Sequence, residues 1–164
     1  MTKATGPLYA VHFRRRREER TDYAKRLGLL KSFQPRLVVR KTNKYVIAQI
    51  IEFELKGDRV IASVTSRDLK NYGFDGKCNT PSSYLVGLLA GVKAKAKGVT
   101  QFVLDIGLHA STKGSLIFAA AKGAIDSGLS SSYSPEKFPS EERISGAHLG
   151  LDKEKFNATK NKIL

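Results

Sequence analysis

RLVVRKTNKYVIAQIIEF, residues 36–53, carries the clearest fold signal in this chain of 164 residues. Residues 36–41 and 45–53 are rich in β-branched and aromatic side chains, a composition typical of β-strands. The link between them is short enough for an antiparallel hairpin, and its Asn43 tolerates the left-handed backbone geometry that such turns use. The sequence therefore predicts a β-hairpin with a basic tip.

The segments after the hairpin predict helices packed on an enlarged sheet. Residues 60–65 read as a third strand, which completes an antiparallel meander. Residues 80–97 predict a helix with Thr80 as N-cap, followed by proline, and with two glycines one turn apart that allow close approach to a sheet. Residues 101–106 form a short apolar run typical of a buried central strand, and a second helix ends at about Ser127. This order predicts an α/β fold with a mixed sheet.

The two ends of the chain predict extensions of this body. Residues 1–20 have no clean period and include four consecutive arginines, so we expect a basic arm that is ordered mainly on a partner. A disordered solubilising tail is the alternative, and a nuclear import signal is a further possibility that is compatible with a partner-binding arm. The α/β body spans residues 21–128. Residues 129–164 form a Ser- and Pro-rich linker and a C-terminal extension that is expected to need a neighbour to hold it.

A short helix is predicted over residues 21–31, where a Thr-Asp pair can supply the N-cap. Its apolar stripe consists of Tyr23, Leu27 and Leu30, which are expected to pack on the body; the alternative is that Tyr23, like Tyr45, stacks on a base. Lys25 and Arg26 lie off this stripe and are available to phosphate.

Positive charge is concentrated near the N-terminus. The chain carries 29 Lys and Arg against 15 acidic residues, a formal net charge of +14. Residues 1–44 hold thirteen of these basic residues and three acidic ones, an excess of ten charges. Such an excess repels itself unless it is neutralised, which predicts a polyanionic partner, with nucleic acid ahead of an anionic membrane or an acidic protein. The lone Cys78 excludes an intrachain disulfide, and the absence of a signal peptide or a membrane-length apolar run predicts a soluble intracellular protein.

Motifs for catalysis are incomplete. The loop that contains Lys113 resembles a P-loop, but that motif requires Gly before Lys, and here the order is Lys-Gly-Ser. The backbone N–H groups at the following helix start, with Lys113, still suit one phosphate of a larger polyanion. Glu52, Asp105 and Asp126 are candidate carboxylates for a metal-dependent nuclease, although Asp105 could equally brace the loop. We therefore predict no enzyme, no catalytic or metal site, no cofactor and no small-molecule substrate, with the nuclease as the alternative.

Three collinear stretches resemble a family of ribosomal proteins. The family is the archaeal and eukaryotic branch of the large-subunit protein that binds 5S rRNA, number eighteen in the bacterial scheme and number five in the eukaryotic one. The stretches are FRRRREERTDYAKRLGLLKSFQPRLVVRKTNKYVIAQI (13–50), NTPSSYLVGLLAG (79–91) and VLDIGLHASTKGSLIFAAAKGAIDSGL (103–129). The later PSEERISGAHLG (139–150) fits the same branch, in a region that bacterial members lack.

The resemblance implies a mixed sheet of the ribonuclease-H-like type without its catalytic carboxylates. It also implies a structural role: the protein binds 5S rRNA and helps attach it to the large rRNA in the central protuberance, beside neighbouring large-subunit proteins. The setting is the cytoplasmic ribosome, with a nucleolar assembly stage if the source is eukaryotic. Phe33 and Gln34 depart from the family pattern, which often has basic or small residues there.

The resemblance also implies three groups of residues that contact rRNA, in the arm and first helix, in the hairpin, and in the loop before the last body helix. They are Arg14, Arg15, Arg16, Arg17, Arg20, Tyr23 and Arg26; then Arg36, Arg40, Lys41, Asn43 and Lys44; then Thr112 and Lys113.

Overall fold

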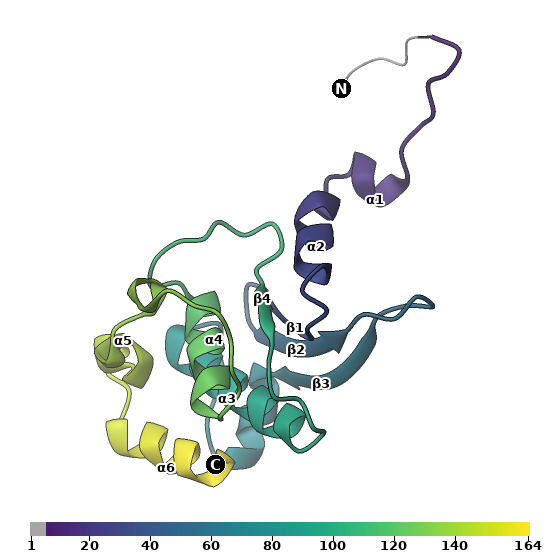
Figure 1. Cartoon of the computed structure of the whole chain (residues 1–164). Helices are drawn as coiled ribbons and strands as arrows, with labels where there is room; N and C mark the ends of the chain where they lie inside the picture. Colours follow the sequence, from purple (N-terminus) through teal and green to yellow (C-terminus); the bar gives the residue numbers. More distant parts are fainter. Residues whose placement is uncertain (1–5) are drawn as a thin grey trace.

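A four-stranded mixed sheet organises the computed structural model, which describes residues 6–164 (Figure 1). The strand order is β3-β2-β1-β4; β1 and β2 pair antiparallel, as do β2 and β3, whereas β1 and β4 pair parallel. The strands are β1 (Arg36–Lys41), β2 (Val46–Glu52), β3 (Arg59–Thr65) and β4 (Val103–Asp105). The predicted α/β fold with a mixed sheet is confirmed, including its antiparallel meander.

The predicted hairpin forms between β1 and β2. Its register pairs Arg36 with Ile51 at one end and Lys41 with Val46 at the other. Thr42 closes the turn, because its N–H donates to the Tyr45 carbonyl at 2.8 Å and its Oγ1 accepts the Tyr45 N–H at 3.0 Å. These bonds leave the tip residues between Thr42 and Tyr45 exposed.

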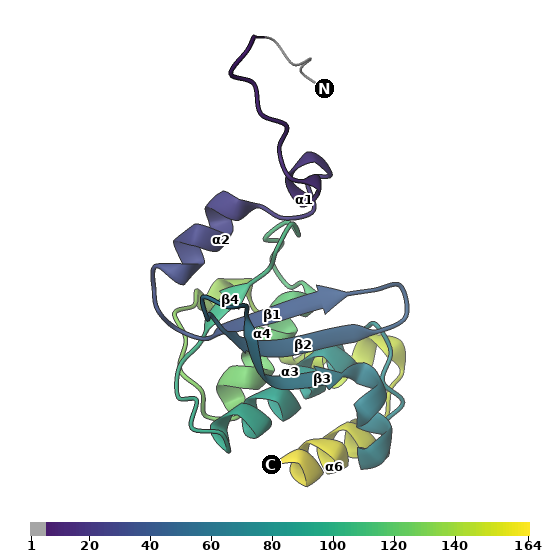
Figure 2. The ribbon, with the colours of Figure 1, turned by 90° about the vertical axis from the view of Figure 1, so that its right-hand side faces the viewer.

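Two helices, α3 (Thr80–Lys95) and α4 (Leu116–Asp126), cover one face of the sheet (Figure 2). The N-cap of α3 is Asn79, whose Oδ1 accepts the N–H of Ser82 at 3.0 Å. The predicted cap, Thr80, is instead the first helical residue, so that prediction is wrong by one position. Asn and Thr are both good caps, and sequence alone does not rank adjacent ones.

Glycines in α3 and α4 let the two helices pack closely against each other. A Cβ atom on Gly87 would lie 2.0 Å from the carbonyl oxygen of Ala120, and one on Gly123 would lie 2.1 Å from that of Tyr84. The close approach predicted between the glycines of α3 and the sheet is therefore wrong, because the contact is between helices. Since α4 covers its second side, α3 is buried almost all round rather than along a single face.

Strand β4 lies at the edge of the sheet, so the prediction of a central strand is wrong. The apolar run over residues 101–106 does indicate burial correctly, since Phe102 is fully buried. Burial and central position are different properties, and a strand on the edge can be covered by helices on its face. The N–H of Phe102 donates to the Ser130 carbonyl at 3.0 Å, which ties the start of β4 to the chain after α4.

The C-terminal extension folds onto the helical layer. Ile144, Phe156 and Ile163 are at most 5% exposed, and the Phe156 ring lies 5.8 Å from that of Tyr84 in α3. The extension therefore finds its neighbour within the chain. Its elements, and the 3-10 helix that follows β3, complete the body: η1 (Ser66–Tyr72), η2 (Pro135–Lys137), α5 (Glu141–Ser145), η3 (Ala147–Leu149) and α6 (Lys153–Ile163).

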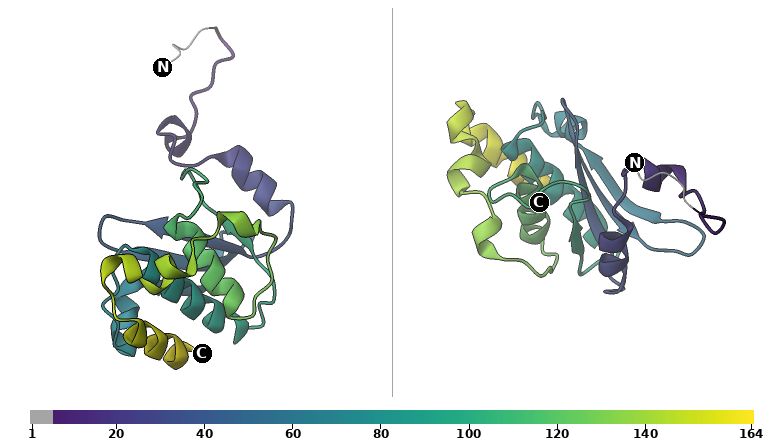
Figure 3. Two further views of the ribbon diagram at one scale, coloured as in Figure 1. Left: turned by 90° about the vertical axis from the view of Figure 1, so that its left-hand side faces the viewer. Right: turned by 90° about the horizontal axis from the view of Figure 1, so that it is seen from above.

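The N-terminal arm stands away from the body on the other side of the sheet (Figure 3). In the structure the arm includes both α1 (Arg14–Arg17) and α2 (Tyr23–Leu30), although the sequence prediction placed residues 21–31 in the body; neither helix has a fully buried residue. The part of the predicted arm that falls on residues 1–5 lies outside the described residues. None of the helices within residues 6–164 is long and apolar enough to span a membrane.

Candidate nucleic-acid interface

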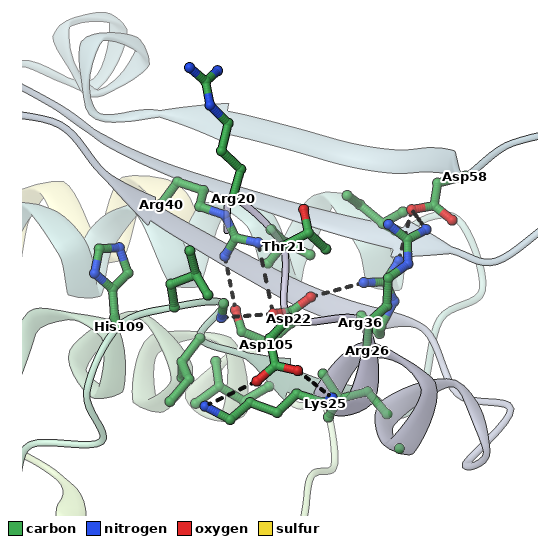
Figure 4. A pocket seen from close by; sticks show the side chains of 18 of the residues that line it. Arg20, Thr21, Asp22, Lys25, Arg26, Arg36, Arg40, Asp58, Asp105 and His109 are labelled. Carbon is green, nitrogen blue, oxygen red and sulfur yellow. Dashed lines mark hydrogen bonds and ion pairs between the residues drawn. The ribbon is translucent and has the colours of Figure 1, made fainter. Parts of the chain in front are cut away.

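Alternation along β1 gives the sheet two different faces. Leu37 and Val39 are fully buried in the core beneath the helices, as expected for residues two apart on a strand. The alternate residues Arg36, Val38 and Arg40 line a hollow of about 670 Å³ on the opposite face, beneath α2 and the arm. Figure 4 shows Arg36 and Arg40 in this hollow. The odd-numbered residues of β1 thus lie in the core, and the even-numbered ones line the hollow.

Cationic side chains from three segments surround this hollow. Arg15 and Arg20 belong to the arm, Lys25 and Arg26 to α2, and Arg36 and Arg40 to β1. They are separated in sequence by up to 25 positions and come together only because α2 folds back over β1. Asp22, Asp58 and Asp105 line the same hollow, so six cations against three carboxylates leave an excess of three positive charges. An excess of this sign suits a polyanion-binding surface.

The arm arginines remain available to a ligand. All of residues 14–17 are exposed, and so is Arg20. Arg14 and Arg20 pair with Glu18 at 3.5 and 2.8 Å, and Arg15 donates to Thr21 Oγ1 at 2.9 Å. Exposed pairs of this kind contribute little, about 0–1 kcal/mol, so they order the arm locally without withholding its charge from phosphate.

Helix α2 begins at the predicted cap. The Asp22 side chain is its N-cap, and the Asp22 Oδ1 accepts the Lys25 N–H at 3.0 Å. Apolar contact is confined to the last turn, where Leu29 and Leu30 are half-buried.

The first turns of α2 present the opposite face from the one predicted. Tyr23 and Leu27 are 45% and 58% exposed, so their predicted packing on the body is wrong. Arg26 turns toward the body instead and bonds to Asp58 at 2.8 Å. In these turns an ion pair, rather than apolar contact, faces the sheet.

Arg36 is at the centre of a chain of ion pairs (Figure 4). Its Nη2 lies 2.8 Å from Asp58 Oδ2, which also accepts the bond from Arg26, and its Nη1 lies 2.9 Å from Asp105 Oδ2. The side chain is only 4% exposed. The resemblance implies that Arg36 contacts rRNA. In the structure its guanidinium is buried and paired with two carboxylates, so we assign Arg36 a structural task.

Asp105 braces the loop that follows β4. Its Oδ1 accepts the N–H of Gly107 at 2.8 Å and lies 3.8 Å from Arg40 Nη2. Arg40 also donates to the Asp105 carbonyl at 3.3 Å. Of the two interpretations of Asp105, the bracing one is confirmed.

The candidate nuclease carboxylates have separate tasks. Asp126 accepts a 2.7 Å hydrogen bond from the Tyr84 hydroxyl; burial, then this bond, raises the pKa of Tyr84 well above its ordinary value. Glu52 is exposed at the end of β2, outside the hollow that contains Asp105. Among residues 6–164, no three His, Cys, Asp or Glu side chains are grouped so that they could hold a metal ion.

The hairpin tip and the loop after β4 extend the basic surface. Lys41, Asn43 and Lys44 are exposed at the tip, and Thr112 and Lys113 are exposed in the loop. A second hollow of about 410 Å³ joins the two segments; Lys41, Thr112 and Arg143 of α5 are among its lining residues. The tail thus contributes a cation, Arg143, that no local sequence signal distinguishes.

His109 lies beside these cations without adding to their charge. Burial, followed by the positive charges of Lys41 and Arg40, lowers the pKa of His109 below its ordinary value. Its imidazole is therefore neutral near pH 7.

Two other residues were missed or misread from sequence. Asp58 lies in the turn before β3, and no local sequence signal indicates that it receives two arginines. Tyr45, a candidate for base stacking, has one ring face covered by the Arg67 guanidinium, 4.1 Å from its centroid. The exposed Tyr23 is the better placed of the two tyrosines.

The fold and this surface define a class of protein. It is a basic α/β protein whose clustered cations suit phosphate, and its candidate nuclease carboxylates lie apart from one another. A family model described as "Ribosomal large subunit proteins 60S L5, and 50S L18" matches residues 8–99 and 91–134. The chain belongs to this uL18 family of large-subunit ribosomal proteins. The predicted family resemblance is thereby confirmed, and the comparisons give no support to a nuclease.

Curated relatives agree with the family model. A protein named "Large ribosomal subunit protein uL18" from Korarchaeum cryptofilum (strain OPF8) is 53% identical over 149 residues, which cover 90% of this chain and 76% of the relative. Relatives of the same name from Methanoregula boonei and Methanothrix thermoacetophila are each 48% identical. Their matches cover 93% and 98% of this chain and 88% and 99% of the respective relative.

Proposed function

We propose that this ribosomal protein binds 5S rRNA and helps attach it to the large rRNA in the central protuberance, beside neighbouring large-subunit proteins in the cytoplasmic ribosome. Family membership supports the ribosomal role. The observation that carries the RNA-binding role is the basic hollow lined by the arm, α2 and β1. The role is structural: the protein supplies shape and charge, and no chemical step is assigned to it.

The sheet belongs, in this proposal, to the ribonuclease-H-like type. Support comes from its order, β3-β2-β1-β4, in which an antiparallel meander is followed by a strand parallel to β1. The catalytic carboxylates of that type have no counterpart in this proposal, because Asp105, at the end of β4, is paired with Arg36 and Arg40.

The proposed RNA contacts fall into three groups with different physical tasks. The arm arginines, 14–17 and 20, neutralise phosphates without reading sequence. The hairpin presents Arg40, Lys41, Asn43 and Lys44 at the fixed spacing of a strand and its turn. Tyr23 offers an exposed ring to an unpaired base, and Thr112 and Lys113 bind a phosphate near the start of α4. Arg26 contributes to the same surface, whereas Arg36 supports it from within.

The test is binding of the purified full-length protein to isolated 5S rRNA over a range of salt concentrations. Changing residues 14–17 to Ala should weaken binding strongly and flatten the plot of log K against log salt. The slope should change by about 0.7 for each phosphate that is no longer neutralised, as a lower guide. The matched control removes four positive charges from the far side, at positions that form no ion pair among the described residues. These positions are Lys93, Lys153, Lys155 and Lys162.

The control separates a located surface from general charge. The proposal expects the control variant to bind with nearly the slope of the parent protein. Equal weakening in both variants would mean that net charge alone drives binding, and unchanged binding by the arm variant would remove the arm from the interface.

A further inference from the structure

The orientation of α2 depends on one carboxylate. No residue of α2 is fully buried, and within residues 6–164 the Arg26–Asp58 bond is the only side-chain hydrogen bond from α2 to the α/β body. Asp58 Oδ2 lies 2.8 Å from Arg26 Nη2 and 2.8 Å from Arg36 Nη2. A single oxygen therefore joins the helix of the arm to the strand β1.

We propose that Asp58 is a positioning residue for RNA binding: it clamps Arg26 of α2 to Arg36 of β1, so that the arm cations stand over the hairpin before RNA arrives. The inference rests on the proposed function, because it assigns a preorganising task within the same basic surface. Preorganisation of this kind lowers the entropic cost of binding. Asp58 is not expected to contact RNA itself.

The far end of the clamp is rigid. Arg36 is 4% exposed and is also held by Asp105, which is itself fixed by the Gly107 N–H and by Arg40. The Asp58 side chain is 24% exposed and the Arg36 side chain 4%, against 36% for Glu18 and 76% for Arg14 in the arm, so the Asp58–Arg36 pair is screened less by solvent and salt than the arm pairs. The chain of ion pairs therefore fixes the position of α2 relative to the sheet.

The backbone connection alone is a weak constraint on α2. The helix joins β1 through a turn in which Phe33 has a φ of +54° and is 96% exposed. A ring so exposed cannot fix the angle of the helix, and the left-handed conformation is unfavourable for a bulky residue. Apolar contact at Leu29 and Leu30 lies at the end of α2 beside this turn, so it acts as part of a hinge. Without Asp58, the start of α2 and the arm are expected to pivot there.

Two explanations of the role of Asp58 predict opposite changes in the affinity for 5S rRNA when its charge is removed. If Asp58 were only a negative charge near the RNA surface, its removal would tighten binding to any polyanion. If it positions α2, its removal weakens binding to 5S rRNA, although the protein has gained positive charge. An unstructured polyuridylate, which demands no fixed arrangement of cations, should bind as well as before or more tightly.

The RNA experiment compares Asp58→Asn with Glu54→Gln in the full-length protein. Glu54 precedes the same turn and forms only an exposed 3.8 Å pair with Arg59, so its neutralisation removes the same charge without touching the clamp. We expect Asp58→Asn to bind 5S rRNA about tenfold more weakly, the scale of one charge-assisted hydrogen bond. Glu54→Gln should bind no more weakly than the parent, and Asp58→Glu should recover much of the affinity. Tighter 5S rRNA binding by Asp58→Asn would overturn the proposal.

A second experiment tests the clamp without RNA. Amide hydrogen exchange in α2 of the free protein should accelerate in Asp58→Asn and in Arg26→Gln, while α6 keeps its protection. The double variant should be no faster than either single variant, because both remove the same bond. Unchanged exchange in α2 would overturn the clamp even if 5S rRNA binding were confirmed. Conversely, failure of the parent protein to bind 5S rRNA would remove the proposed function while leaving this result in place.

Arg26→Gln keeps the test decisive if Asp58→Asn does not fold. It removes only the α2 end of the clamp and leaves the Asp58–Arg36 pair intact. Faster exchange confined to α2 in that variant supports the proposal, and parental exchange overturns it.

Discussion

The two extensions of this body are attached by different forces. The C-terminal tail buries Ile144, Phe156 and Ile163 against the helical layer, whereas α2 has no fully buried residue and is oriented by the Arg26–Asp58 pair. Burial of apolar surface is insensitive to salt and contributes stability directly, while a partly exposed ion pair contributes little and is screened. The comparison shows that the tail is part of the folded core and that the arm leaves most of its apolar and cationic groups exposed.

Removing a tail anchor is expected to have the largest effect on stability. Phe156→Ala should lower the free energy of unfolding by about 3–5 kcal/mol, because it deletes a buried aromatic ring packed on Tyr84. The matched control is Phe13→Ala, which removes the same ring from a site in the arm that is 89% exposed and should cost less than about 0.5 kcal/mol. Urea unfolding followed by circular dichroism measures both. Similar destabilisation of the two variants would contradict the division between core and arm.

Breaking the ion-pair chain at its centre should come next. Arg36→Met leaves Asp58 and Asp105 without their shared guanidinium and should cost about 3 kcal/mol, the scale for removing one partner of a buried pair. Arg59→Met, at an exposed 3.8 Å pair nearby, is the control and should be nearly neutral. The substitution at Arg36 should also loosen α2, which amide exchange would report. A stable variant with an ordered α2 would show that the chain of pairs does not support the arm.

The same contrast explains what sequence predicted and what it did not. The β1–β2 hairpin and helices α3 and α4 were predictable because their signals are local: β-branched runs, a turn residue, and a proline in the first turn of α3. The rotation of α2 was not, because the apolar stripe at Tyr23 and Leu27 competes with an ion pair to Asp58, more than 30 positions away. Charge counting indicated an excess of positive charge near the N-terminus but could not separate Arg36, which is buried, from its exposed neighbours.

The edge position of β4 and the docking of the tail were missed for a related reason. Both depend on which elements meet in space. The apolar residues of the tail are few and spaced among charges, so their pattern is weak until Tyr84 and α3 provide a surface for them.

Acid should affect the start of α2 before it affects α6. The backbone hydrogen bond from the Lys25 N–H lowers the pKa of Asp22 below its ordinary value. The contribution of this cap is therefore present above the unfolded-state pKa and disappears as the pH falls through the lower folded-state pKa. Asp152, the N-cap of α6, makes no such side-chain bond.

Cα chemical shifts measured from pH 5 to pH 2 would detect the difference. Those of α2 should move toward coil values in the acidic part of the range, ahead of those of α6. Asp22→Asn is the control, because Asn caps a helix without titrating in this range, and it should remove the difference. Simultaneous melting of both helices would mean that Asp22 does not govern α2.

The smallest effect is expected at the turn between α2 and β1. Phe33 adopts a left-handed conformation with its ring in solvent, so it gains no packing to offset the strain. Phe33→Gly should therefore raise the free energy of unfolding by up to about 1 kcal/mol, whereas Phe33→Ala, which keeps a Cβ atom, should change it much less. Urea unfolding measures both variants.

Glycine at this position also makes the turn more flexible. In the Phe33→Gly variant the orientation of α2 therefore depends mainly on the ion pair with Asp58. If α2 keeps its exchange protection in Phe33→Gly and becomes unprotected only when Asp58→Asn is added, the ion pair rather than the turn orients the arm. If Phe33→Gly alone frees α2, the strained turn is the orienting element. In that case the tail is held by apolar packing, and the arm is oriented by the backbone conformation of the turn rather than by an ion pair.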